Sequence, residues 1–317
     1  MTNGIGIKRE FLRKFASLDN MKDCIFFRKN LKPATRGGEF FAAFRENKLD
    51  FYFAGSRPFS RNSKSYRMND AYFPSKGEAS PKSGEILVPA DDIDRNFIAI
   101  KQRCQLKGKA SRENFQISKL FRNFSAIANK FDGKKPLLID VEATFYSLDH
   151  EEGRRSDRID LVFLMPNKKL FFVEVKRRRD SRVRSAIGKP EVISQVGKYN
   201  AQLKCRENQI VKAYKNSISL VNELFDTQIP MPEGVVRPVA LLIVDDPGDM
   251  PMDNQKSTKN GDIWLQPALN ELNGKNKIWT KSSTLCVDGR FHFSESSNEV
   301  SSGFGSLLCE AASWNMP

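Results

Sequence analysis

Acidic side chains near the middle of the chain are of the types that hold a divalent metal ion. Asp160 lies in one apolar segment, and the next apolar segment ends on Glu174, Val175 and Lys176. Burying carboxylates is strongly disfavoured unless a cation compensates their charge. Mg²⁺ prefers hard oxygen ligands, keeps several waters, and favours attack of water on phosphorus. The residue types therefore predict hydrolysis of phosphodiester bonds.

A β-hairpin would place these side chains together. The apolar segments 158–163 and 170–176 flank a turn signal at Pro166 and Asn167. Side chains alternate along a strand, so Glu174 and Lys176 share one face, and the neighbouring strand brings Asp160 beside them. We expect Asp160, Glu174 and the carbonyl of Val175 to hold the metal. Lys176 would orient the attacking water or offset phosphate charge. The alternative is a cross-strand ion pair of small energetic value.

The combination of Asp160 with Glu174-Val175-Lys176 resembles the signature of the PD-(D/E)XK nuclease superfamily, although Ile159 stands where the namesake proline would be. The resemblance covers roughly residues 95 to 250. It implies Mg²⁺ or Mn²⁺ as cofactor, the aspartate and glutamate as ligands, and a lysine that assists water. It also implies an α/β, restriction-endonuclease-like core of order αβββαβ, with a mixed central sheet flanked by helices.

A second element, Gln195 and Tyr199, resembles the glutamine-x-x-x-tyrosine motif of the RecB-like branch of that superfamily. Residues four apart on a helix share a face. Gln195 would then contact the metal ligands or a phosphate. Tyr199 is also compatible with a core position, because it continues an amphipathic stripe of Val192, Val196 and Leu203.

One further acid is expected near the metal, and two residues compete for that role. Glu113 lies near the start of a predicted helix, where branches of the superfamily without the RecB-like histidine carry a glutamate. The alternative for Glu113 is an ordinary acid in a first helical turn. Glu142 lies on a predicted strand at 137–145 and would approach Asp160 if the two strands pair. The alternation of this strand predicts Asp140, Glu142 and Thr144 on one face.

The charge of the chain favours a polyanionic partner. There are 52 Lys and Arg residues against 38 Asp and Glu, a net charge of +14. This excess attracts polyanions and is shared by other basic proteins, so it does not distinguish DNA from RNA; DNA is the partner that the nuclease resemblance implies, and RNA is not excluded. The expected phosphate contacts follow the Glu174 strand; they are Arg177, Arg178, Arg179, Arg182, Lys198 and Tyr199. A solvated linker or a sorting signal is the alternative for the arginine run.

Three regions are predicted. Residues 1–90 form an accessory α+β region, residues 91–250 the nuclease-like core, and residues 251–317 an extension with no assigned chemistry. A linker is expected at 75–84. The expected strands are 40–44, 49–53, 137–145 and an interior strand at 238–244. The expected helices are 93–105, 111–131 and a helix that starts at Pro190 and carries Gln195 and Tyr199, followed by another amphipathic stretch that reaches Phe225.

Cations and rings interleave in the N-terminal region, where they would either hold a nucleic-acid strand or form the core. They are Arg57, Arg61, Lys64 and Arg67 with Phe59, Tyr66, Tyr72 and Phe73. No apolar run reaches the length of a bilayer span, and the five cysteines show no metal or disulfide spacing. We therefore expect a cytoplasmic protein with reduced thiols, whose oligomeric state the sequence does not indicate.

The sequence as a whole predicts a metal-dependent deoxyribonuclease, by analogy in restriction, defence or DNA repair. Three alternatives remain: a catalytically inactive nucleic-acid-binding module with a nuclease fold, a structural or assembly protein whose charge binds RNA or DNA, and a nuclease that acts on RNA.

Overall fold

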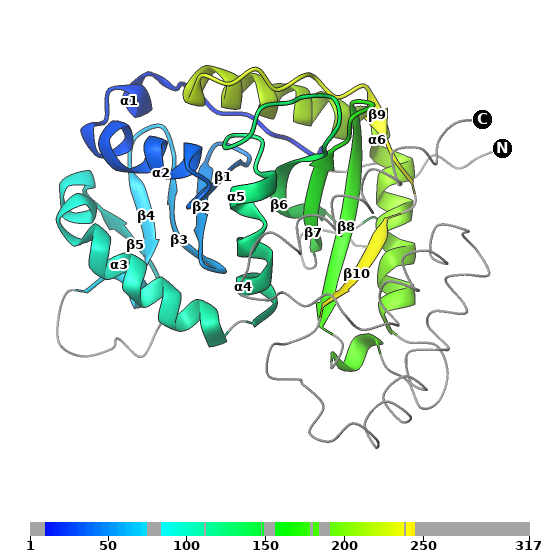
Figure 1. The fold of residues 1–317 in the computed structure, drawn as a ribbon, viewed down its shortest axis with the longest axis horizontal. Helices are drawn as coiled ribbons and strands as arrows, with labels where there is room; N and C mark the ends of the chain where they lie inside the picture. Colours follow the sequence, from blue (N-terminus) through cyan, green and yellow to red (C-terminus); the bar gives the residue numbers. More distant parts are fainter. Residues whose placement is uncertain are drawn as a thin grey trace.

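The computed structural model describes residues 10–74, 84–110, 112–146, 148, 156–177, 180–183, 191–237 and 239–244. These residues form an α/β protein with two sheets and helices packed against both (Figure 1). The predicted linker, apart from Gly84, and the predicted C-terminal region 251–317 lie outside them. No helix among the described residues is long and apolar enough to cross a membrane.

The first sheet is antiparallel, with its five strands in sequence order from β1 to β5. Strands β1 and β2 confirm the two strands predicted in this region. Ala54 and Gly55 join β2 to β3 with φ angles of 48° and 78°, and positive φ at both positions is what a tight two-residue hairpin turn requires. The strands are β1 (Phe41–Phe44), β2 (Leu49–Phe53), β3 (Ser56–Arg61), β4 (Tyr66–Asn69) and β5 (Glu85–Val88).

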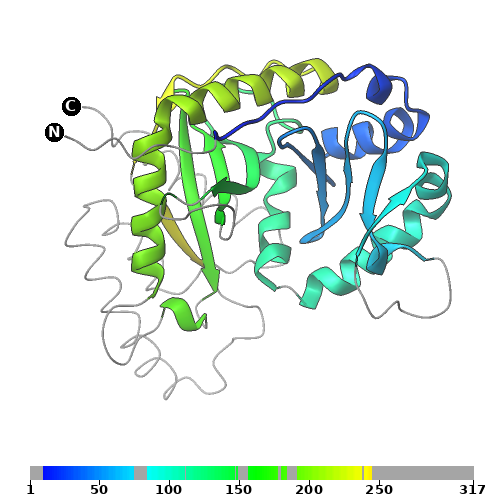
Figure 2. The same cartoon turned by 180° about the vertical axis from the view of Figure 1, so that it is seen from behind.

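Helices cover the first sheet (Figure 2). Helix α3 (Ala90–Ala110), which includes the predicted helix 93–105, packs on β2 and β3. Its Phe97 ring lies 5.4 Å from that of Phe26 and 5.7 Å from that of Phe40. The short helices of this region are α1 (Asp19–Lys22), η1 (Phe27–Leu31), α2 (Lys32–Arg36) and η2 (Asp70–Tyr72).

The second sheet is mixed, in the order β10-β8-β7-β6. Strands β6, β7 and β8 are antiparallel neighbours, whereas β9 and β10 run parallel to β8. Strand β10, which was predicted as an interior strand, pairs only with β8 among the described residues and so lies at the edge of the sheet that these residues form. The strands are β6 (Leu137–Tyr146), β7 (Ser156–Leu164), β8 (Lys169–Arg177), β9 (Gly234–Val235) and β10 (Ala240–Val244).

Helices α4 (Arg112–Lys119) and α5 (Phe121–Phe124) lie between the two sheets (Figure 1). The ring of Phe121 packs at a tilt against Phe41 of the first sheet, and the ring of Phe124 packs edge-on against Phe163 of the second. The predicted single helix 111–131 was wrong, since the helix is interrupted at Leu120 and ends at Phe124. Ser125 has an extended backbone and bridges to β6, because pairing with the sheet replaces the next helical turn.

The opposite side of the second sheet is covered by α6 (Glu191–Phe225), a 35-residue helix that bends and reaches the first helices (Figure 2). The predicted amphipathic stretch is therefore one continuous helix. Val192, Val196, Tyr199 and Leu203 are all buried, as their stripe predicted.

Strand β6 departs from the predicted alternation. Val141 packs in the core between the sheets, whereas Ala143 belongs to the opposite core. Two irregularities in the strand account for this: a register shift between Leu138 and Asp140 precedes Val141, and Glu142, with a left-handed φ of 53°, precedes Ala143. Asp140 and Glu142 consequently lie in different surroundings, so the single polar face predicted for this strand was wrong.

A buried charge cluster around Asp140 joins the two sheets. Asp140 is 2% exposed, and its carboxylate accepts hydrogen bonds from Arg13 at 3.0 Å, Arg45 at 2.5 Å and Tyr214 at 2.8 Å. These partners come from the N-terminal segment, the end of β1 and α6. Burial would raise the pKa of Asp140, but the charges of Arg45 and Arg13 outweigh it and lower that pKa.

Candidate active site

The β7–β8 hairpin places Asp160 beside Glu174. Leu161 pairs with Val173, so the next residues outward, Asp160 and Glu174, are cross-strand neighbours. The Val175 amide on β8 donates a hydrogen bond of 2.8 Å to Asp160 Oδ2, and this bond holds the Asp160 carboxylate against β8. The three predicted metal-binding residues thus meet at one point of the sheet.

Lys176 lies at the same point. Its Nζ contacts Glu174 Oε1 and donates a hydrogen bond of 3.1 Å to the Val175 carbonyl. Lys176 is 2% exposed and Glu174 is 1% exposed. Removing either partner alone would leave a buried charge without its counter-ion, which is strongly destabilising.

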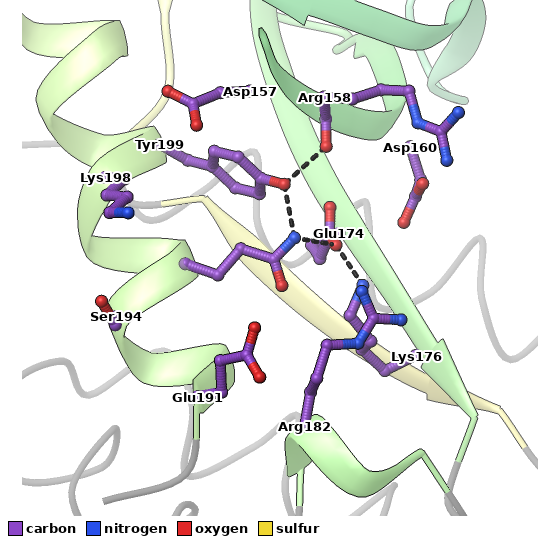
Figure 3. Close-up of a pocket in the computed structure, with 11 residues that line it drawn as sticks. Asp157, Arg158, Asp160, Glu174, Lys176, Arg182, Glu191, Ser194, Lys198 and Tyr199 are labelled. Atoms are coloured by element: carbon purple, nitrogen blue, oxygen red, sulfur yellow. Dashed lines mark hydrogen bonds and ion pairs between the residues drawn. The ribbon is translucent and has the colours of Figure 1, made fainter. Parts of the chain in front are cut away.

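Helix α6 supports the acidic residues from the side. Gln195 Nε2 donates to Glu174 Oε1 at 2.9 Å and to the Tyr199 hydroxyl at 2.6 Å. The hydroxyl in turn donates to the Arg158 carbonyl at 2.5 Å. Gln195 therefore contacts a predicted metal ligand. Tyr199 is buried, and its hydroxyl ties α6 to β7 (Figure 3).

These side chains line a cavity of about 480 Å³, which we call the reaction cavity. Asp160, Glu174, Lys176, Gln195 and Tyr199 form its wall together with six other residues (Figure 3). Four of the six were not predicted as site residues: Asp157, Arg158, Glu191 and Ser194. Arg158 is two residues from Asp160 on the same strand, and Glu191 is four residues from Gln195 on the same helix, so these spacings could have indicated both. The six are Asp157, Arg158, Arg182, Glu191, Ser194 and Lys198.

Electrostatics distinguish Asp160 from an ordinary surface acid. Burial raises the pKa of Asp160, and the nearby charge of Lys176 and the Val175 amide only partly oppose this. Burial likewise raises the pKa of Tyr199, and the charge of Glu174 adds to the effect, so its hydroxyl remains protonated at neutral pH. An additional cation at Asp160 would favour its ionised form.

The two candidates for a further acid near the metal, Glu142 and Glu113, lie on different elements of the fold. Glu142 is opposite Asp160 on β6, because the pairs Val141–Leu161 and Ala143–Ile159 flank it. Its carboxylate is 3.3 Å from the Arg158 guanidinium, and it does not line the reaction cavity. Glu113 lies in the first turn of α4, and its side chain is outside the described part of the structure.

The predicted phosphate contacts are described only in part. Arg182 and Lys198 line the reaction cavity, and Arg182 is held by Asp180 at 2.6 Å. The side chain of Arg177 and the whole of Arg178 and Arg179 lie outside the described residues.

The oxygen donors fit the chemistry of Mg²⁺ or Mn²⁺. Two carboxylates and one backbone carbonyl are hard ligands, and Mg²⁺ is usually held by one or two carboxylates plus substrate phosphate. Within the described residues there is no group of three or more His, Cys, Asp and Glu side chains that could hold a metal ion. A metal at Asp160 and Glu174 would therefore need water or substrate oxygens to complete its coordination.

Comparisons with known proteins give no relative on which to base a family assignment. No family model, curated protein or solved structure matches the chain.

Proposed function

We propose that the protein is a metal-dependent nuclease that hydrolyses DNA phosphodiester bonds on a PD-(D/E)XK-type core. The observation that carries this proposal is the convergence of Asp160, Glu174 and Lys176 on one cavity, with Gln195 bonded to Glu174. The alternative reading, an exposed cross-strand ion pair, would not predict two buried carboxylates in the wall of a polar cavity.

The order of the elements supports the same core. The helices α4 and α5, the strands β6, β7 and β8, the helix α6 and the strand β10 follow the helix-strand-strand-strand-helix-strand order that the resemblance implies. The parallel pairing of β10 with β8 gives the mixed sheet. Because fold alone does not establish function, the proposal depends on the site chemistry.

Asp160, Glu174 and the Val175 carbonyl would hold a Mg²⁺ or Mn²⁺ ion. When bound, such an ion lowers the pKa of water and offsets charge that develops on phosphorus. Lys176 has three N–H donors, and Glu174 and Val175 use two of them within the described residues. The third donor can orient a water or a phosphate oxygen. Gln195 holds the Glu174 carboxylate in place.

A catalytically inactive nucleic-acid-binding module is the second candidate. The observation in its favour is the direct contact of Lys176 with Glu174 and Val175, since an ammonium group there already neutralises one acid without a metal. A cleavage assay separates the two candidates. Wild type, Asp160→Asn and Lys176→Met would be incubated with plasmid, linear duplex, single-stranded DNA and RNA, in Mg²⁺, Mn²⁺ or EDTA.

The matched controls are Asp132→Asn and Lys135→Met, the same chemical changes in an exposed loop that does not line the reaction cavity. Charge stabilisation by a metal is worth several kcal/mol, so Asp160→Asn should lose at least about a hundredfold in cleavage rate. Lys176→Met should also lose cleavage, and because it breaks a buried ion pair its result counts only where circular dichroism shows that the variant is folded. Cleavage by the site variants at the rate of the controls would refute the proposal. Metal-independent binding without any cleavage would select the inactive module, and cleavage of RNA alone would change the substrate.

A further inference from the structure

A second cavity, of about 260 Å³, shares Asp160 with the reaction cavity. We call it the Tyr72 cavity. Its walls come from the β2–β3 hairpin, η2, α3, α4 and α5 on one side and from β6 and β7 on the other. Side chains of the N-terminal sheet therefore line a cavity whose wall also includes Asp160 of the proposed reaction centre.

The wall is preformed by close packing. Gly55, in the β2–β3 turn, has a φ of 78°, and a Cβ there would lie 2.5 Å from the backbone nitrogen of Phe115 on α4. Only a glycine permits this approach, so the turn is fixed against the helix that carries Asn114 into the same cavity. Arg57 is fixed as well, by ion pairs with Asp50 at 3.4 Å and Glu85 at 2.8 Å.

The chemistry of the Tyr72 cavity differs from that of the reaction cavity. Apolar and aromatic side chains occupy much of its wall, whereas the reaction cavity is lined almost entirely by polar and charged groups. Tyr72 is half-buried, and the Lys107 ammonium lies 5.4 Å from the centre of its ring. Aromatic rings beside cations hold nucleic-acid strands, because bases stack on the rings and phosphates pair with the cations.

The polar groups of the Tyr72 cavity suit the edge of a base. Asn114 offers both a donor and an acceptor, and Glu142 offers acceptors. The pairing of Glu142 with Arg158 offsets its charge, which reduces repulsion of a nearby phosphate.

The small size of the cavity favours one base as the occupant. Its volume is below the roughly 300 Å³ at which ordinary small-molecule sites begin, so larger ligands fit it poorly. A base inside a duplex is stacked and paired, and it can enter such a cavity only when it is unpaired. We propose that the Tyr72 cavity holds one unpaired nucleotide of the substrate strand, next to the phosphate at Asp160. The inference rests on the proposed nuclease function and names its substrate class: single-stranded or locally melted DNA.

The test measures binding without cleavage. Fluorescence anisotropy in EDTA would compare a labelled single-stranded oligonucleotide with the blunt duplex of the same sequence. The variants are Tyr72→Ala, Tyr72→Phe and Lys107→Ala. Lys215→Ala, which removes an exposed charge on α6 and lines neither cavity, is the matched control. Circular dichroism and thermal melting would establish that each variant is folded.

Wild type should prefer the single strand. Tyr72→Ala should weaken single-strand binding about fivefold or more with little change for the duplex, while Tyr72→Phe keeps the ring and stays near wild type. Lys107→Ala should reduce the slope of log affinity against log salt by about 0.7 on the single strand. If the fold of Tyr72→Ala is disturbed, Lys107→Ala decides, since Lys107 is exposed.

Two outcomes separate this inference from the proposed function. If Tyr72→Ala and Lys107→Ala are folded and bind the single strand as well as Lys215→Ala does, the nucleotide site is refuted, even if wild type cleaves DNA. If the single-strand preference depends on Tyr72 but no metal supports cleavage, the nucleotide site stands and the nuclease function falls.

Discussion

Replacing Asp140 should destabilise the protein strongly, because the charge cluster around it is buried and joins distant parts of the chain. In Asp140→Asn, the guanidinium groups of Arg13 and Arg45 lose their shared carboxylate, and these arginines are only 4% and 8% exposed. Breaking a buried ion pair by removing one partner costs about 3–5 kcal/mol. We expect the free energy of unfolding to fall by an amount in this range. Two arginines lose their partner at once, which increases the loss, but Asp50 still lies 3.4 Å from Arg45, which limits it.

Thermal and urea unfolding at neutral pH would measure the effect. For a folded unit of this size, each kcal/mol corresponds to about 2–4 °C in Tm, so Asp140→Asn should lower Tm by about 6–20 °C. The matched control is Glu207→Gln, whose carboxylate lies 3.6 Å from Arg237 on the surface. An exposed pair of this kind contributes about 0–1 kcal/mol.

The pH dependence has a definite sign. The pKa of Asp140 is lowered in the folded protein, so its contribution is present at neutral pH and is lost as the pH falls through that lowered pKa. The difference between wild type and Asp140→Asn should therefore shrink only in strong acid. A loss no larger than that of Glu207→Gln at neutral pH would refute the reasoning. Asp140 lines neither cavity, so the folded variant should show the same proposed cleavage activity as wild type.

Three further predictions follow from the site and its supports. The pKa of Asp160 is raised in the folded protein, so ionisation of this carboxyl costs stability as the pH rises through that value. Asp160→Asn should therefore raise Tm at neutral pH in EDTA. Mg²⁺ should raise the Tm of wild type but not that of the variant. Tyr199→Phe removes the bond to the Arg158 carbonyl and should lower the free energy of unfolding by about 1 kcal/mol in urea titrations, with slower cleavage. Gly55→Ala should lower Tm more than Gly133→Ala, because both glycines have positive φ but only Gly55 would place a Cβ against backbone atoms.

The hairpin of the candidate site could be predicted because its signals are local. The alternation within 170–176 places Glu174 and Lys176 on one face, and the turn signal at Pro166 sets the partner strand. The structure has both features, with Asp160 bonded to the backbone next to Glu174. Four-residue spacing similarly placed Gln195 and Tyr199 together on a helix.

Other features depend on contacts that no local pattern contains. Asp140 finds its arginines 127 and 95 residues away in the sequence, so its burial could not be read from an alternating strand. The left-handed backbone of Glu142 has no signal either, since glutamate rarely adopts it. The helix ending at Phe124 gives way to pairing with β6, and tertiary pairing overrides helix propensity.

The N-terminal aromatic residues that the sequence singled out differ in burial, and their predicted contact with a nucleic-acid strand stays a prediction. Phe59 and Tyr66 are buried, and the Arg61 guanidinium stacks 4.5 Å from the centre of the Tyr66 ring, so these three belong to the core. Tyr72 and Arg57 instead line the cavity that includes Asp160. Composition cannot make this distinction, because it depends on where β3, η2, α3 and β7 lie relative to one another in the folded protein.

Two buried aspartates on neighbouring strands differ in the positive charge that the protein supplies to them. Asp140 on β6 accepts hydrogen bonds from two arginines and a tyrosine, and its pKa is lowered because the protein supplies the counter-charge. Asp160 on β7 accepts a hydrogen bond from the backbone amide of Val175, and its pKa is raised because burial outweighs the attraction of the Lys176 charge. An added cation would therefore gain more at Asp160 than at Asp140. Carboxylates whose environments move their pKa values apart are typical of a functional acid beside a structural one.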